Sequence, residues 1–355
     1  MSSAETPESI PVDFRLESYD YELPPSLIAQ RPADRRDRSK LLVVRPDEQP
    51  EHAIFAELGE YLRPGDVLVA NDTRVLKARF HPKRRGGGRA QVLLLHPTDE
   101  AGVWEALVRP GQRVRVGDRL RLGDEAGIDV VGRTDLGTRF VRFDGIDAAA
   151  AMERYGHVPL PPYIKNEPPD AEERYQTVYA RERGSAAAPT AGLHFTPELI
   201  DSLQARGVEW TTITLHVGAG TFAPVRADDI RNHRMHAERY VVGVEAARAI
   251  ESARSRGGRV VAVGTTAVRA LEDAALSSRS GAVTPGERWT RIFIHPPFEF
   301  RVADALITNF HLPHSSLLML ACAFAGRDRV LDAYADAIRL DYRFYSFGDA
   351  TLLFR

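Results

Sequence analysis

The spacing of hydrophobic positions changes twice along the chain and divides it into three stretches. The first stretch contains the apolar run at 40–45, which predicts a strand. In the segment HAIFAELGEYL that follows, Ile54, Leu58 and Leu62 recur at helical spacing, so a helix ending before Gly65 is predicted.

The second stretch is built from short alternating segments. Glycine and proline separate these segments, and no helical periodicity interrupts them. We therefore expect residues 65–146 to form a separate, inserted domain, a small antiparallel β-barrel. The segments are DVLVAND, RVLKARF, AQVLLLHP, VWEALVRP, RVRVGDRLRL, GIDVVGR and TRFVRFDG.

In the third stretch, helical patterns alternate with β-branched strands, as in TPELIDSLQARGV followed by EWTTITLHV and in VEAARAIESARSRGG followed by RVVAVG. This alternation is typical of an α/β domain whose sites lie at the strand ends. We expect residues 11–64 and 147–355 to form this larger domain together.

Charge is unevenly distributed in a chain whose net charge is only −2. Residues 74–121 hold twelve Arg or Lys against four Asp or Glu, which makes this stretch strongly basic. Within it, Lys83, Arg84 and Arg85 lie on the glycine-rich tip HPKRRGGGRA, where they can follow a phosphate backbone. A solvated charged turn is the alternative interpretation of this tip.

Several classes of protein are disfavoured. Cys322 is the single cysteine, so no disulfide is possible and a buried thiol is expected. No metal site is expected, because His233, His236 and Glu238 lack the i, i+4 histidine spacing of helical zinc sites. No apolar run approaches the ~20 residues that span a bilayer, and the first residues lack a basic leader, so a cytoplasmic location and no membrane partner are expected.

Two loop segments combine a histidine with small residues. His194 lies in APTAGLHFTPEL, just before a helix start in which Thr196 is the expected N-cap, although a histidine between two apolar residues is more often a packed side chain. His216 precedes a glycine turn in TLHVGAGTFAPVR, where backbone amides could approach a ligand.

Two further segments lie where a strand ends. RVVAVGTTAVRALE is a buried strand that runs through Gly264 into a helix, which suits anion or ribose binding but also fits an ordinary capped helix. In LITNFHLPHSSLLMLACAFAG, Asn309 and His311 precede an apolar helix that Ser315 or Ser316 could cap.

Taken together, the collinear segments resemble the S-adenosylmethionine:tRNA ribosyltransferase-isomerase family of queuosine biosynthesis. The matching blocks span residues 14–353 and include FRLESYDYELPPSLIAQRP, LRPGDVLVANDTRVLKAR, APTAGLHFTPEL, TLHVGAGTFAPVR, HRMHAERY, VVAVGTTAVRALE, TNFHLPHSSLLMLACAFAG and YRFYSFGDATLL. The chain departs mildly from the family at Phe293–Phe298, where the usual Pro-Gly-aromatic step is replaced.

The resemblance implies a monomer with no bound cofactor or metal. Such an enzyme takes S-adenosylmethionine as co-substrate and transfers its ribosyl moiety to 7-aminomethyl-7-deazaguanine at the tRNA wobble position. The product is epoxyqueuosine-tRNA, and adenine and methionine are released.

Motif position in the family suggests three sets of residues. The proton carriers are expected to be His194, His216, Glu238 and His311. The donor is expected to contact Thr190, Gly192, Gly218, Gly220, Thr221, Gly264, Thr265, Thr266 and Asn309. The tRNA is expected to contact Asn71, Asp72, Thr73, Arg74, Lys77, Lys83, Arg84 and Arg85.

These residue types suit the chemistry. The sulfonium acidifies the adjacent carbon, so a base can remove a proton there and expel adenine, and the attacking amine must also lose a proton. Histidine can serve either step near neutral pH, and the residues do not assign one histidine to one step. A methyltransferase using the same donor and a non-catalytic tRNA-binding module are the two alternative functions.

Overall fold

The structure, a computed structural model, describes residues 10–135, 137–165, 169–218 and 225–355. The chain divides into two compact units. The large unit comprises the chain to Thr73 together with Pro162–Glu182 and Ala188–Arg355, and the small unit comprises Arg74–Pro161 and Arg183–Ala187.

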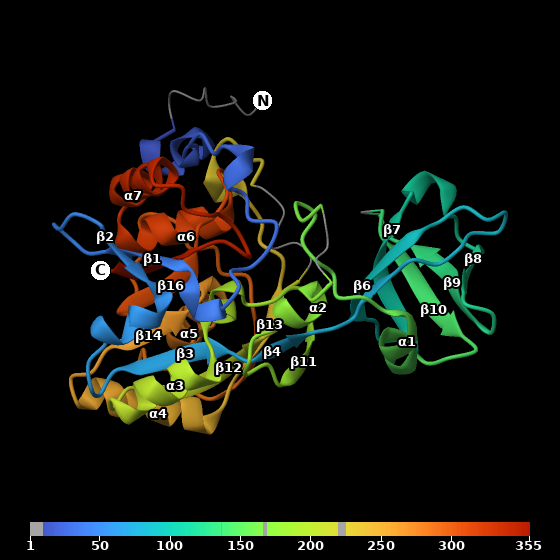
Figure 1. Ribbon diagram of the computed structural model, residues 1–355. Helices are drawn as coiled ribbons and strands as arrows, with labels where there is room; N and C mark the ends of the chain where they lie inside the picture. The colour runs from blue at the N-terminus through green and yellow to red at the C-terminus, as the bar shows by residue number, and fades with distance from the viewer. Residues whose placement is uncertain (1–9, 136, 166–168, 219–224) are drawn as a thin grey trace, which may run out of the picture. The chain divides into compact units, whose positions relative to one another are not determined.

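A nine-stranded mixed sheet forms the centre of the large unit (Figure 1). Its strand order is β15-β13-β12-β3-β14-β16-β17-β1-β2. In that order the strands are Gly286–Thr290, Glu238–Val242, Glu209–Leu215, Val67–Asn71, Val260–Val263, Ala305–Asn309, Ala350–Phe354, Lys40–Val44 and Glu51–Ile54.

The four central strands β12, β3, β14 and β16 are parallel, so all four end at the same edge of the sheet. Strand β13 runs antiparallel to β12, and β17 runs antiparallel to β16, so both begin at this edge. We call it the carboxyl edge, and we call the other end of the same strands the opposite edge. Ligands in such sheets bind at the carboxyl edge, as the sequence predicted for this half of the chain.

Helices and 3₁₀ segments cover both faces of the sheet, and alternate residues of one strand serve the two faces. Val261 and Val263 pack on one face with α3 and two 3₁₀ segments, whereas Ala262 packs on the other with α5, α6 and α7. The helices of this unit are α2 (Ala171–Arg174), α3 (Pro197–Ala205), α4 (Val244–Ser255), α5 (Thr265–Leu276), α6 (Ser316–Ala325) and α7 (Arg327–Arg339); the two 3₁₀ segments are Phe55–Glu60 and Thr190–His194.

Two predicted helix starts are confirmed. The Thr196 hydroxyl accepts a hydrogen bond from the Leu199 amide and Pro197 begins α3, while Ser315 caps α6 in the same way through the Leu318 amide. Cys322 is a buried free thiol within α6, also as predicted. None of the described helices is long and apolar enough to cross a membrane.

The small unit contains a six-stranded antiparallel sheet, in the order β5-β6-β7-β10-β9-β8, with α1 (Ala148–Tyr155) packed against it. Beyond the end of β5, the Lys83 amide donates to the Arg121 carbonyl, and the Arg121 amide donates back. The strands are Arg79–Phe80, Gln91–Pro97, Val103–Arg109, Arg139–Asp144, Ala126–Arg133 and Arg119–Leu122. Where the chain passes between the units, β4 (Thr73–Val75) and β11 (Glu182–Ser185) pair with each other.

The mixed α/β class, with a large mixed sheet and a separate small antiparallel sheet, is confirmed. Three local predictions are wrong. The helix α1, expected to belong to the larger domain at 147–355, packs on the small sheet, and the small unit continues to Pro161. β3 belongs to the large sheet rather than to the inserted module, because every residue of Val67–Asn71 is buried, as expected of a strand covered on both faces. The helix predicted around Leu58 is instead a strand, β2, followed by a six-residue 3₁₀ segment.

Candidate active site

The carboxyl edge gathers the predicted proton carriers and most of the predicted donor contacts of the large unit. β12 ends beside His216, β3 ends at Asn71, β14 ends at Gly264 and β16 ends at Asn309, while β13 begins with Glu238. The 3₁₀ segment Thr190–His194 packs against β16 and brings His194 to the same place. Residues far apart in the sequence thus meet at one end of one sheet.

His194 is only 5% exposed, and its ring packs on Phe55 with centroids 5.0 Å apart. Burial lowers the pKa of His194 to about 4, an effect that the Asp349 carboxylate partly opposes, so the ring is neutral near pH 7. Its Nδ1 lies 2.7 Å from the Ser39 hydroxyl, which donates its own hydrogen to the Arg36 carbonyl at 3.4 Å. A proton on Nδ1, directed at the Ser39 oxygen, would leave a lone pair on Nε2, whereas a proton on Nε2 would serve the hydrogen bond with Asn309 that raises the pKa of His194.

Two buried side-chain acceptors at this edge make no hydrogen bond of good geometry within the described part of the chain. They are Nε2 of His194 and Oδ1 of Asn309. The Asn309 amide nitrogen donates to the Tyr345 carbonyl at 2.9 Å, which fixes the orientation of the side chain. Asn309 also raises the pKa of His194, so the two side chains lie close enough to interact. Unpaired buried polar atoms are costly, and a group that donates hydrogen bonds can satisfy both acceptors.

His216, the residue directly after β12, has a similar arrangement. Its Nδ1 lies 2.9 Å from the Thr73 hydroxyl, which donates to the Glu182 carbonyl at 3.4 Å. Desolvation, followed by the charge of Arg239, lowers the pKa of His216. His216 lines a cavity of about 500 Å³ together with residues of β12, β13 and the first turn of α4.

Glu238 and Arg269 form a buried ion pair at the start of β13. The other Glu238 oxygen accepts the Gly218 amide at 3.0 Å, so this carboxylate fixes the backbone that follows β12. The Nη2 atom of Arg269 is buried without a partner. Arg269 is a residue that sequence reasoning missed, because nothing in its helix distinguishes it from an exposed arginine.

The predicted tRNA contacts of the large unit are buried. The Asn71 side chain bonds both the amide and the carbonyl of Leu215, and the Asp72 carboxylate accepts from Thr212, Thr214 and Arg181. Both side chains therefore hold β12 against the end of β3. This position suits a role in shaping the site more than a surface contact with RNA.

The predicted donor contacts lie in two places. Gly264 has a φ of 92°, a conformation that favours glycine, and leads into α5, where the Thr266 hydroxyl accepts from Asn71 at 3.3 Å. Gly192, next to Thr190 and Ala191 in the 3₁₀ segment, faces the Tyr179 hydroxyl so closely that a Cβ would come within 1.9 Å of it. Thr265 is the first residue of α5 and is buried. Gly220 and Thr221 lie outside the described residues.

His311 is placed differently from the other two histidines. Its Nε2 lies 2.8 Å from the Thr308 hydroxyl, its backbone amide donates to the Tyr334 hydroxyl, and burial lowers its pKa to about 3. Across the described residues, no group of His, Cys, Asp and Glu side chains is arranged to hold a metal ion.

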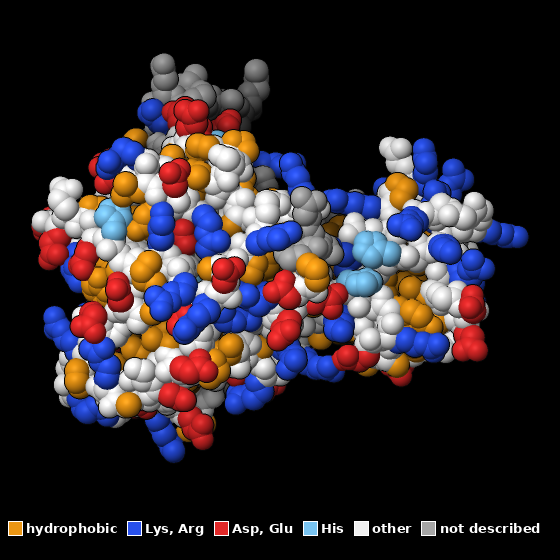
Figure 2. Space-filling model, in the orientation of Figure 1, with side chains coloured by type: hydrophobic (Ala, Val, Ile, Leu, Met, Phe, Trp, Pro, Cys, Tyr) orange, Lys and Arg blue, Asp and Glu red, His pale blue; other side chains and the backbone are white. Residues whose placement is uncertain are grey.

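The predicted tRNA contacts of the small unit are mostly exposed. Arg74, Lys83 and Arg85 are exposed, while Lys77 and Arg84 are half-buried. Arg84 and Gly88 close the glycine-rich tip through a hydrogen bond of 2.7 Å between the Arg84 amide and the Gly88 carbonyl. In Figure 2, blue Lys and Arg side chains gather along the upper and right sides of this unit.

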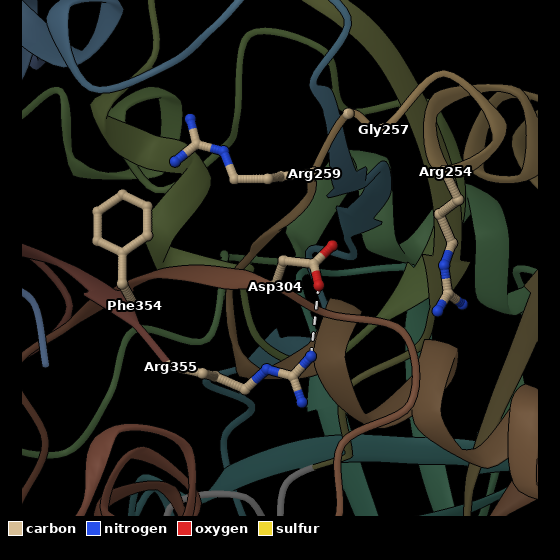
Figure 3. A pocket seen from close by; sticks show the side chains of 7 residues that line it. Arg254, Gly257, Arg259, Asp304, Phe354 and Arg355 are labelled. Carbon is tan, nitrogen blue, oxygen red and sulfur yellow. Dashed lines mark hydrogen bonds and ion pairs between the residues drawn. The ribbon is translucent and has the colours of Figure 1, made fainter.

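A second cavity, of about 520 Å³, lies at the opposite edge of the large sheet (Figure 3). Arg254, Arg259, Asp304 and Arg355 line it, and Asp304 pairs with Arg355 at 3.3 Å. None of the residues predicted for catalysis or binding lines this cavity.

Comparison with known proteins gives one consistent result. The family model described as "Queuosine biosynthesis protein" matches residues 16–353. Proteins named S-adenosylmethionine:tRNA ribosyltransferase-isomerase from Moorella thermoacetica and Symbiobacterium thermophilum are each 54% identical, over 96% of this chain and 100% of theirs. A crystal structure of an S-adenosylmethionine tRNA ribosyltransferase from Thermotoga maritima matches with a TM-score of 0.54 and 40% identity, covering 94% of this chain and 99% of that one.

Proposed function

The chain belongs to the queuosine biosynthesis protein family, and from this premise we propose that it is an S-adenosylmethionine:tRNA ribosyltransferase-isomerase. It transfers and isomerises the ribosyl moiety of S-adenosylmethionine onto 7-aminomethyl-7-deazaguanine at the tRNA wobble position. Adenine and methionine leave, and epoxyqueuosine-tRNA is formed. S-adenosylmethionine is consumed as a co-substrate, and the protein holds no resident cofactor or metal.

The observation that carries the catalytic assignment is the pair of open acceptors, Nε2 of His194 and Oδ1 of Asn309. The aminomethyl group of the deazaguanine has N–H donors for both atoms. His194, neutral near pH 7, then takes the proton that the amine must lose before it attacks. Asn309 orients the amine without changing charge.

A second base is needed for the carbon next to the sulfonium, and His216 is suited to it. Like His194, it bonds a hydroxyl through Nδ1 and is left with Nε2 as a proton acceptor, and it lines a cavity. The protonated imidazole can afterwards return the proton to the departing adenine. Glu238 and His311 act as positioning residues in this proposal, because their polar atoms already bond the surrounding chain.

The small unit would bind tRNA through Arg74, Lys77, Lys83, Arg84 and Arg85. Asn71, Asp72 and Thr73 would shape the site from the end of β3. The inserted domain predicted at 65–146 would then begin after β3, and we propose that it closes as a β-barrel. The reciprocal Lys83–Arg121 hydrogen bonds support closure, because they link the chain beyond one edge strand to the other edge strand. We further propose that the protein acts as a cytoplasmic monomer.

The function is tested by incubating the protein with labelled S-adenosylmethionine and tRNA that carries the deazaguanine. Release of adenine and methionine, with label retained on the tRNA, is the expected result. Formation of adenosylhomocysteine would instead indicate a methyltransferase, and tRNA binding without any donor turnover would indicate a non-catalytic module.

A further inference from the structure

Three side chains form a row across β12, β13 and β15, at one side of the large sheet. The His216 amide donates to the Arg239 carbonyl at 3.0 Å, which continues the β12–β13 ladder by one residue pair. In the neighbouring ladder, Arg239 lies directly opposite Trp289 of β15. Residues opposite each other in antiparallel strands point to the same face, so His216, Arg239 and Trp289 share one face.

The outer end of this row is unusually exposed. Trp289 is 65% exposed, and it lies on β15, the edge strand of the sheet. An indole left open to water buries little apolar surface in the free protein, so folding alone gives no reason for tryptophan at this position. An exposed aromatic side chain of this kind is more often part of an interaction surface.

The middle of the row is a flat cation held in place. Arg239 forms two parallel hydrogen bonds with Glu287, from Nε to Oε1 at 2.6 Å and from Nη2 to Oε2 at 2.8 Å. This fork fixes the plane of the guanidinium, and the Arg239 side chain is 40% exposed, so a base can stack on the plane. Arg239 and His216 also line the same cavity of about 500 Å³, so the row leads from the sheet edge to a proposed catalytic base.

We propose that Trp289 and Arg239 form a stacking platform for an unpaired base of the tRNA loop that carries the deazaguanine. The proposal rests on the proposed function and deepens it by naming a contact surface for the RNA. Enzymes read single-stranded RNA by splaying bases onto aromatic rings and guanidinium planes, and both kinds of surface are present here in register. Stacking on Trp289 would place the neighbouring nucleotide towards His216.

The open position of the row favours RNA over the adenine of the donor. Small ligands bind in concave sites that enclose most of their surface. Trp289, in contrast, projects from β15, the last strand on this side of the sheet, and is 65% exposed, a position that a polymer can cross. The adenine of S-adenosylmethionine and a second copy of this chain are therefore the competing occupants that the experiment has to separate.

The test compares Trp289→Ala with Trp289→Phe in the full-length protein. Loss of one base–aromatic stack should raise the KM for tRNA roughly 5- to 150-fold in Trp289→Ala. The KM for S-adenosylmethionine and the kcat should stay within about twofold, because Trp289 does not touch the reacting atoms in this proposal. Trp289→Phe, which keeps an aromatic face, should recover most of the affinity.

A direct binding measurement tests the contact with RNA independently of whether the protein has the proposed activity. An anticodon stem-loop RNA should quench the tryptophan fluorescence of the wild type, and Trp289→Ala should lose that part of the quench whether or not turnover occurs. Arg239→Lys, which keeps the charge but not the plane, should weaken binding, whereas Leu340→Ala, another exposed apolar side chain, should not. Absence of adenine release in the wild type would overturn the proposed function alone.

Three outcomes would overturn the platform. One is an unchanged KM for tRNA and an unchanged quench in Trp289→Ala. Another is a rise in the KM for S-adenosylmethionine instead, which would assign the row to the donor. The third is a change in oligomeric state without a change in RNA binding, which would make Trp289 a contact between copies of the chain.

Discussion

The two edges of the nine-stranded sheet are both rich in charged and polar side chains. They differ in how completely these side chains are hydrogen-bonded within the protein. At the opposite edge, the Asp66 carboxylate accepts from the Arg63 amide and from the amide and guanidinium of Arg259, and Asp304 accepts from Val260 and Arg355. Among the described residues, no buried side-chain atom of Asp66, Arg259, Asp304 or Arg355 lacks a partner.

At the carboxyl edge, by contrast, buried atoms of His194, Asn309 and Arg269 have no partner. An unpaired buried polar atom destabilises the fold, and functional sites are one place where such atoms are kept. The polar groups at the opposite edge therefore serve stability, and the proposed function assigns the unpaired atoms of the carboxyl edge to the substrates. Charge and cavity size do not separate the edges, because the opposite edge also has a cavity, of about 520 Å³.

The largest expected effect is on the free energy of unfolding, and it distinguishes a buried ion pair from a partly exposed one. Glu238→Ala leaves Arg269 buried without its carboxylate, so the free energy of unfolding should fall by about 3–5 kcal/mol. Asp304→Ala at the opposite edge should cost about 1–3 kcal/mol, because the Asp304–Arg355 pair is about one-third exposed and the loss is mainly that of the hydrogen bond from the buried Val260 amide. Denaturant unfolding measures both, and equal losses would remove this difference between the edges.

A smaller effect concerns acid stability. His194 and His311 have pKa values lowered to about 4 and about 3, against about 6.5 in the unfolded chain, so below pH 6.5 the unfolded state binds more protons. The free energy of unfolding should therefore fall with decreasing pH, by up to about 1.4 kcal/mol per pH unit for each histidine, and stay flat in this respect above pH 7. His194→Asn or His311→Asn should each reduce the slope by one proton. An unchanged slope in both variants would contradict the buried, neutral state assigned to them.

The smallest effect concerns the basic surfaces. Replacing Lys83, Arg84 and Arg85 together by alanine should raise the KM for tRNA about tenfold and reduce its salt dependence, because fewer phosphate counterions are released. The KM for S-adenosylmethionine should not change. Arg254→Ala, at the cavity of the opposite edge, is the matched control and should leave both KM values within twofold. If Arg254→Ala weakened tRNA binding as much as the triple variant, the opposite edge would have to be counted as an RNA surface.

Local patterns predicted much of the fold. The helix starts at Thr196 and Ser315 followed from capping chemistry that acts within four residues. The strand β3 was assigned to the wrong sheet, because a short apolar run does not reveal which strands it will pair with. The segment around Val67 was interpreted as one of the alternating strands of the small domain. In the structure this strand, β3, lies between β12 and β14 in the large sheet.

The candidate site was only partly predictable, because local patterns do not show which distant segments come into contact. His194 and His216 could be singled out by their motifs, whereas Ser39, which bonds His194, lies 155 residues away in the sequence. Asn71 and Asp72 were grouped with the tRNA contacts by motif position, and their burial could not be foreseen from a segment that ends in polar residues. Trp289 had no sequence signal either, since its exposure depends on β15 being an edge strand.

The most direct test of the difference between the two edges is a single-turnover measurement on His194→Ala beside Arg254→Ala, with the thermal midpoint taken on the same preparations. If His194 moves a proton at the carboxyl edge, its removal should lower the chemical rate by ~10² to 10⁴-fold while tRNA still binds, and Arg254→Ala should react like the wild type. A wild-type rate in His194→Ala with a lowered midpoint would contradict the account, because His194 would then be a core side chain and its open Nε2 would have no catalytic meaning.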